Sequence, residues 1–193
     1  MTRNSDFHRS LTVSGIASPC RFILWVMALC FASAASIRAQ GTFREVFQSG
    51  IEAFQNQEAR AAYARFSEMA AVFKDEPDFH DPEFQHVFLP LYGMSALYAG
   101  EYPVAAQTLS AYFGLDLQTT RQDAALLLGW SFAARQLEDW ATLISCYDRF
   151  ITAYPHHPET PIVQFERILV LFHSGQYDEA SAATRLYSRS DAP

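Results

Sequence analysis

The sequence predicts an all-α fold, built from about four helix pairs that follow an N-terminal targeting segment. The segment from Leu91 to Phe113 reads as two amphipathic helices separated at Gly100, and similar segments occur three more times. No part of the chain shows the sustained alternation of apolar and polar residues that marks a β-strand. Half of the 193 residues are apolar and 18% are charged, so the chain can bury a core and is not typical of a disordered protein.

Residues 1–39 have the pattern of a secretory signal. Arg21 precedes an apolar run from Phe22 to Ala35, and cleavage after the small residues that follow would leave Gln40 at the new terminus. Only 16 residues, 22–37, separate the flanking arginines, which is at or below the roughly 17 to 25 residues that cross a bilayer. We therefore expect a cleaved signal and an exported protein of the periplasm or cell envelope. An uncleaved membrane anchor over 22–37 stays open, and membrane contact is expected only through this segment.

The charge balance excludes a class of partners. The chain has 14 Lys and Arg against 21 Asp and Glu, a formal net charge of −7. Loss of residues 1–39 would remove four arginines and one aspartate, so the remainder is more acidic still. Nucleic-acid binding requires a clustered positive surface, so no nucleic-acid partner is expected. Cys146 is the one cysteine after the leader, which rules out a disulfide within that part of the chain.

Four repeat units account for the remainder, near residues 43–76, 86–119, 124–157 and 161–193. Their first helices carry Gly50, Gly93 and Ser131 where they meet the second helices, and such small side chains let two helix axes approach closely. Ile168 takes that position in the fourth unit. The second helices carry Ala62, Ala105, Leu143 and Ala180 at equivalent positions, which are 43, 38 and 37 residues apart, and Phe66, Leu109, Tyr147 and Thr184 follow them.

The second and fourth units match each other best, with Gly, an acidic or amide residue, Tyr and Ala recurring in "GEYPVAA" and "GQYDEAS". These units resemble the tetratricopeptide repeat, a helix pair with small residues at its crossing and bulky residues late in its second helix. The resemblance spans Phe43 to Tyr187 and implies a right-handed superhelical solenoid. The boundary "AYPHHPETP" is similar to that of exported, periplasmic members of the family. One such unit cannot bury its apolar face alone, whereas four stacked units can.

The connections between units carry start and stop signals for helices. Asp81 can cap the helix that Pro82 begins, since proline is tolerated at the first helical position. Pro90 either kinks this helix or marks a later start at Phe88. In the third connection one helix should end at Tyr154, and the next should start around Pro161.

No catalytic motif is present in the sequence: it has no glycine-rich phosphate loop, no Gly-x-Ser-x-Gly and no His-Glu-x-x-His. The chain is therefore expected not to be an enzyme and to need no cofactor. A metal site is conceivable at "HDPEFQH", which carries His80, Asp81, Glu83 and His86. Its histidines are six residues apart, however, and helical ligand pairs are separated by three or four, so a polar connection is the preferred interpretation.

The family resemblance implies that the first helices line a concave groove for a protein or peptide ligand. The residues assigned to it are aromatic or apolar except for two: Phe47, Ile51, Phe54, Met94, Leu97, Tyr98, Phe132, Arg135, Phe165, Leu169, Phe172 and His173. Any one of them could instead pack between repeats, because apolar side chains are mostly buried.

We therefore expect a non-catalytic scaffold that mediates protein–protein interaction in the cell envelope. The alternative is that the chain is the N-terminal docking region of a longer exported protein, whose activity lies beyond residue 193. Self-association through exposed repeats also stays open.

Overall fold

The computed structural model describes residues 39–115 and 123–190, with side chains described over 43–115 and 123–188. Contacts divide the chain into Met1–Ile37 and Arg38–Pro193, and all described elements belong to the second unit. The predicted signal or anchor lies outside the described residues, except for Ala39. None of the helices within the described ranges is both long and apolar enough to cross a membrane.

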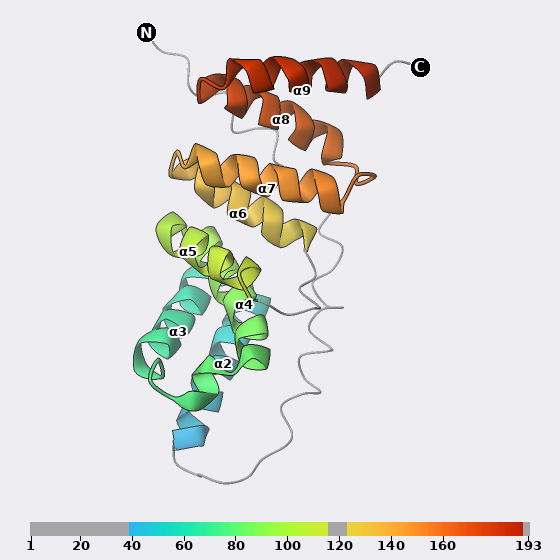
Figure 1. Cartoon of the computed structure of the whole chain (residues 1–193). Coiled ribbons are helices and arrows are strands. Elements are labelled where there is room, and N and C mark those ends of the chain that lie inside the picture. Colours follow the sequence, from blue (N-terminus) through green and yellow to red (C-terminus); the bar gives the residue numbers. More distant parts are fainter. Residues whose placement is uncertain (1–38, 116–122, 191–193) are drawn as a thin grey trace. The chain divides into compact units, whose positions relative to one another are not determined.

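The described residues form eight α-helices and one 3-10 helix, with no strand, which confirms the predicted all-α class. Each α-helix packs on the next one along the chain (Figure 1). The helices are α2 (Ala39–Gln55), α3 (Ala59–Val72), η2 (Pro77–His80), α4 (Pro82–Ala99), α5 (Tyr102–Phe113), α6 (Ala124–Gln136), α7 (Trp140–Ala153), α8 (Thr160–His173) and α9 (Tyr177–Ser190). Short turns join α2 to α3, α4 to α5, α6 to α7 and α8 to α9, which gives four helix pairs.

The same turn closes all four helix pairs. Each turn contains one residue with a positive φ: Gln57 (62°), Gly100 (86°), Glu138 (55°) and Gly175 (80°). These positions are 43, 38 and 37 residues apart, the spacing seen in the sequence. In each turn the N–H after this residue donates to the carbonyl five residues earlier at 2.9 Å, as Glu101 does to Ala96. This bond satisfies a carbonyl that the helix end would otherwise leave without a partner.

Glycine allows the close crossings within the first two pairs. A Cβ atom on Gly50 would lie 2.6 Å from Cε1 of Phe66, and one on Gly93 would lie 2.8 Å from Cγ of Leu109. In the fourth pair the small and the large side chain at the crossing are exchanged. Its first helix has Ile168 where the others have small residues, and its second helix has Thr184, which is exposed, where the others bury a large side chain.

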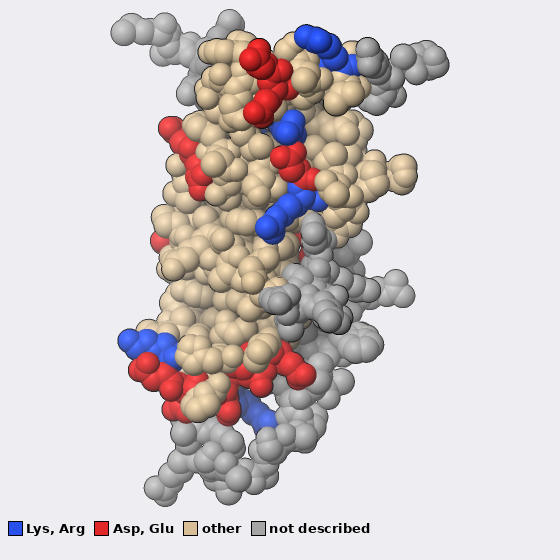
Figure 2. Space-filling model, in the orientation of Figure 1, with Lys and Arg blue, Asp and Glu red and all other residues tan. Residues whose placement is uncertain are grey.

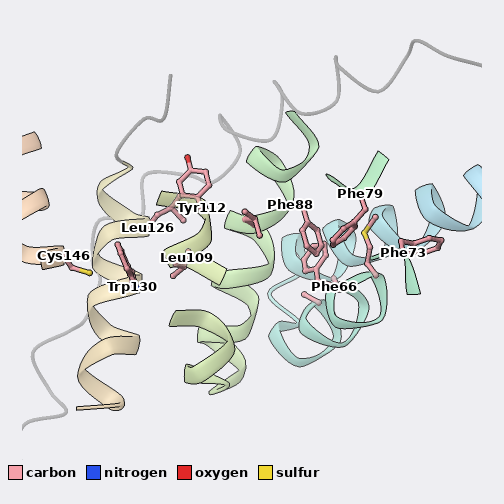
Figure 3. Close-up of a cluster of buried hydrophobic side chains, with 13 residues drawn as sticks. Phe66, Phe73, Phe79, Phe88, Leu109, Tyr112, Leu126, Trp130 and Cys146 are labelled. Atoms are coloured by element: carbon pink, nitrogen blue, oxygen red, sulfur yellow. The ribbon is translucent and has the colours of Figure 1, made fainter. Parts of the chain in front are cut away.

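The largest buried cluster runs from α2 to α7 and is rich in aromatic residues (Figure 3). The ring of Phe88 lies 5.9 Å from that of Phe66 and 5.2 Å from that of Phe79, centroid to centroid. Phe113 stacks on Trp130 at 5.2 Å and so joins α5 to α6. A second cluster, which includes Tyr147 and Phe150, continues the core toward α8. Burial of these aromatic side chains is the main stabilising contribution to the helix stack.

Helix α4 begins at Pro82 and contains Pro90, so the alternative start at Phe88 is wrong. As predicted, the carboxylate of Asp81 caps the helix: it accepts hydrogen bonds from the N–H groups of Glu83 (2.7 Å) and Phe84 (3.2 Å). Stacking of Phe84 on Phe88, at 5.4 Å, holds the turns before Pro90 against the core. These contacts explain why a proline, which cannot donate its intrahelical hydrogen bond, does not end this helix.

Candidate functional site

Exposed apolar side chains are concentrated on the fourth helix pair. Nine large apolar residues are exposed within the described ranges, and six of them belong to α8 and α9. Four follow one side of α8: Ile162, Phe165, Leu169 and Phe172, with exposures of 52, 49, 39 and 59%. Tyr177 at the start of α9 is also exposed, and its ring lies 5.2 Å from that of Phe172. We call these five residues the α8–α9 face.

A groove of about 310 Å³ runs along this face between α8 and α9. It is lined by Ile168, Leu169 and Phe172 on one side and by Tyr177, Ser181 and Thr184 on the other. The size reversal at Ile168 and Thr184 is consistent with the groove, because α9 has a threonine at the position where the other second helices bury a large side chain. The groove adds apolar surface to the exposed stripe on α8, and a contiguous exposed apolar surface is a candidate interaction site.

The first helices of the earlier pairs use the equivalent positions for internal packing. Met94 and Leu97 of α4 face Gly129 of α6 so closely that a Cβ there would lie 2.9 Å from Sδ of Met94 and 3.2 Å from Cδ2 of Leu97. The equivalent residues of α8, reached by adding the repeat spacings, are Leu169 and Phe172. The α8–α9 face therefore has the chemistry of a surface that packs against another helix.

The residues that the sequence analysis assigned to a concave groove along the first helices fall into two groups. Phe165, Leu169, Phe172 and His173 lie exposed on α8, and Tyr98 is exposed near the end of α4. The other seven are half-buried among the helices. Phe47 packs in the core with its ring 5.2 Å from Phe84, Ile51 and Phe54 contact the same cluster, Met94 and Leu97 pack on α6, Phe132 lies 6.0 Å from Tyr102, and Arg135 forms an ion pair.

Two residues of the face, Ile162 and Tyr177, are missing from the sequence-based assignment. Ile162 precedes Phe165 by three residues, so extending the helical period by one turn would have found it. Tyr177 begins a second helix, whereas the assignment considered first helices only. The α8–α9 groove was not predicted; the signal that could have found it is the exchange of side-chain sizes at Ile168 and Thr184 relative to the other units.

A polar cluster joins α6, α7 and α8. The guanidinium of Arg135 in α6 donates to the Tyr147 hydroxyl in α7 and to the Glu166 carboxylate in α8, and the Tyr147 hydroxyl donates to the same carboxylate at 2.7 Å. Burial and the charge of Glu166 raise the pKa of Tyr147. The three groups satisfy one another, so the cluster acts as a structural link between pairs.

The cysteine, histidine and aspartate side chains that could react or bind a metal are also held in structural contacts. Cys146 is buried, and this burial raises the pKa of its thiol to about 12, so the thiol is both inaccessible and protonated at neutral pH. Asp81 caps α4, His80 contacts the carbonyl of Lys74, and His86 lies beside Tyr112 with ring centroids 5.3 Å apart. Across the part of the chain that the structure describes, no three His, Cys, Asp or Glu side chains are grouped to hold a metal ion.

Charge is unevenly distributed over the visible surface. On the side of the molecule shown in Figure 2, basic side chains are interspersed with acidic ones and form no continuous basic stripe. The side shown therefore lacks the clustered positive surface that phosphate binding requires. No protein-family model matches this chain, and no curated protein is significantly similar to it.

Proposed function

We propose that this protein is a non-catalytic helical-repeat scaffold of the tetratricopeptide type, which binds protein through its α8–α9 face. The observation that carries the proposal is the exposed apolar stripe on α8, in which Leu169 and Phe172 occupy the positions that α4 uses to pack against another helix. An amphipathic helix laid into an apolar groove is a common mode of protein recognition. The four identical turns at the repeat spacing support the repeat assignment.

The proposed location is the periplasm or cell envelope. Support comes from the sequence of residues 1–39, with its apolar run between flanking arginines and its small residues before Gln40. A fusion of this segment to a reporter that is active only after export should give active reporter. Replacing two residues of the apolar run with arginine should abolish that signal. Export that survives the arginine variant would contradict the assignment.

Photo-crosslinking in cells tests the docking proposal directly. A photoreactive phenylalanine analogue is placed at Phe172, and illumination should produce a covalent adduct with a protein. Val72 in α3 is the matched control position, because it is exposed to a similar degree but lies at a distance from α8 in the sequence of packed helices. We expect adducts from position 172 and none from position 72. Absence of any adduct at 172 in a folded, correctly located protein would refute the proposed function.

A further inference from the structure

We propose that the occupant of the α8–α9 face is a second copy of this chain, which docks by antiparallel pairing of α8 with α8 of the other copy. The inference rests on the proposed function and names the partner for the same site. Four observations carry it: the spacing of the apolar residues on α8, the charges on α9, the relative levels of the two helices, and the distribution of exposed apolar residues over the described unit.

The apolar residues of α8 form a self-complementary seam. Ile162, Phe165, Leu169 and Phe172 are separated by three, four and three residues, the spacing of a coiled-coil seam. In an antiparallel pairing centred on residue 167, Ile162 faces Phe172 of the other copy and Phe165 faces Leu169. The seam extends over ten residues, or about 15 Å of helix. Every exposed apolar side chain of α8 thus meets another one.

The charges on α9 are complementary under the same kind of pairing. Asp178 and Arg185 are seven residues apart, two turns, and so lie on one side of the helix. Their midpoint falls between Ser181 and Ala182, whose small side chains permit a close approach of two helices. An antiparallel copy of α9 about this midpoint places each Asp178 opposite the other copy's Arg185. Two opposite-charge contacts result, and no like-charge contact is formed.

A single two-fold axis can serve both helices. Ring contacts fix the relative levels of α8 and α9: Phe172 lies 5.2 Å from Tyr177, and Phe165 lies 6.3 Å from Tyr187. Interpolation between these contacts puts the level of residue 167 beside about residue 184 of α9. That level is within one helical turn, about 5.4 Å, of the midpoint between Asp178 and Arg185. Because a shift of the axis moves each partner twice as far, an axis set by the seam leaves Asp178 about five residues, roughly 8 Å along the helix, from direct opposition to Arg185 of the other copy, an offset that the long arginine side chain has to span.

The described surface disfavours head-to-tail stacking of copies. Such stacking needs a second apolar surface, at the α2 end, to receive the α8–α9 face. Among the described side chains of α2 and α3, Val72 at the end of α3 is the one large apolar residue that is exposed, and a single side chain does not make a second apolar surface. A face that meets its own copy about a two-fold axis needs no second surface, so the isologous arrangement is the one that the exposed residues fit.

Light scattering and sedimentation test the pairing. The whole chain is measured in mild detergent, and the chain from Gln40 onward is measured in buffer, because the two preparations must give the same result if the face alone mediates pairing. We expect a dimer that becomes monomeric when Leu169→Glu and Phe172→Glu are combined. Leu186→Glu is the control, since Leu186 is 68% exposed on α9 but lies outside the face. Circular dichroism confirms that the variants remain helical, and a wild-type monomer at all concentrations overturns the inference.

A mixing experiment tests the register. Asp178→Arg alone and Arg185→Asp alone each place like charges together across the axis, and each should raise the dimer Kd by about tenfold. An equimolar mixture of the two variants restores opposite charges in both contacts, so a mixed dimer should form with near wild-type affinity. Failure of the mixture to restore pairing overturns the antiparallel arrangement.

The crosslinked product at Phe172 separates this inference from the proposed function. An adduct with twice the mass of the chain, whose peptides derive only from this chain, supports both. An adduct with a different protein supports the proposed function and overturns the second copy as occupant. The absence of any adduct overturns both.

Discussion

Replacing Gly93 with alanine should reveal how closely α4 and α5 approach. The new Cβ would lie 2.8 Å from both Cγ and Cδ2 of Leu109, which is fully buried. Carbon atoms prefer about 3.5 to 4.0 Å, so the two helices or the leucine must move. Overpacking of this kind costs about 1 to 3 kcal/mol, and the better helix propensity of alanine returns about 1 kcal/mol. We expect a net loss of about 1 kcal/mol.

Removing Leu109 should reverse the sign of this effect. In a Leu109→Ala background the atoms that clash are gone, so Gly93→Ala should then stabilise the protein by up to about 1 kcal/mol through helix propensity alone. The assay is urea denaturation followed by circular dichroism for the four members of the double-mutant cycle. Leu109→Ala itself should cost about 2 to 5 kcal/mol. The reasoning fails if Gly93→Ala stabilises the wild-type protein, or if its effect is equal in both backgrounds.

Three further predictions concern other parts of the structure. Gly100→Ala should destabilise the protein by about 1 kcal/mol, because φ is 86° there; nothing lies within 4 Å of the added Cβ, so the backbone strain is the whole effect. Gln57→Gly at the equivalent turn should stabilise the protein, and urea denaturation should therefore give changes of opposite sign for the two variants. Glu166→Ala should lower the free energy of unfolding by about 1 to 3 kcal/mol, because it leaves Arg135 and Tyr147 without their carboxylate partner. Glu166→Gln should lower it less, and equal losses for the two variants in urea denaturation would contradict this reasoning. Stability should fall above about pH 9. Burial raises the pKa of Cys146 and Tyr147 in the folded protein, whereas the same groups ionise near 9.0 and 10.0 in the unfolded chain, so rising pH favours the unfolded state. A free energy of unfolding that increases between about pH 9 and 11 would contradict this.

The helix class and the turn positions could be predicted because they depend on local chemistry. Gly100 and Gly175 mark two of the four turns, and the carboxylate of Asp81 caps its helix as its place before Pro82 indicates. The close crossing at Gly93 also follows from the absence of a side chain. These features need only residue type and helical period.

The exposure of side chains along the first helices could not be predicted in the same way. Helical period places Leu97 and Phe172 at equivalent positions, yet Leu97 is covered by α6 and Phe172 is exposed. Whether a neighbouring helix covers a position depends on how pairs stack, which is a property of the whole array. Arg135 shows the same dependence, since its partners come from two other helices.

The packing of each helix mainly on its neighbours in the chain has a consequence for how the protein reaches this state. Contacts between residues close in sequence form with little loss of loop entropy, so structures dominated by them fold rapidly. The pair α2–α3 can begin to assemble before α8 and α9 have been synthesised, and each later pair can add to a surface that already exists. The order of synthesis is thus also the order in which the core can grow.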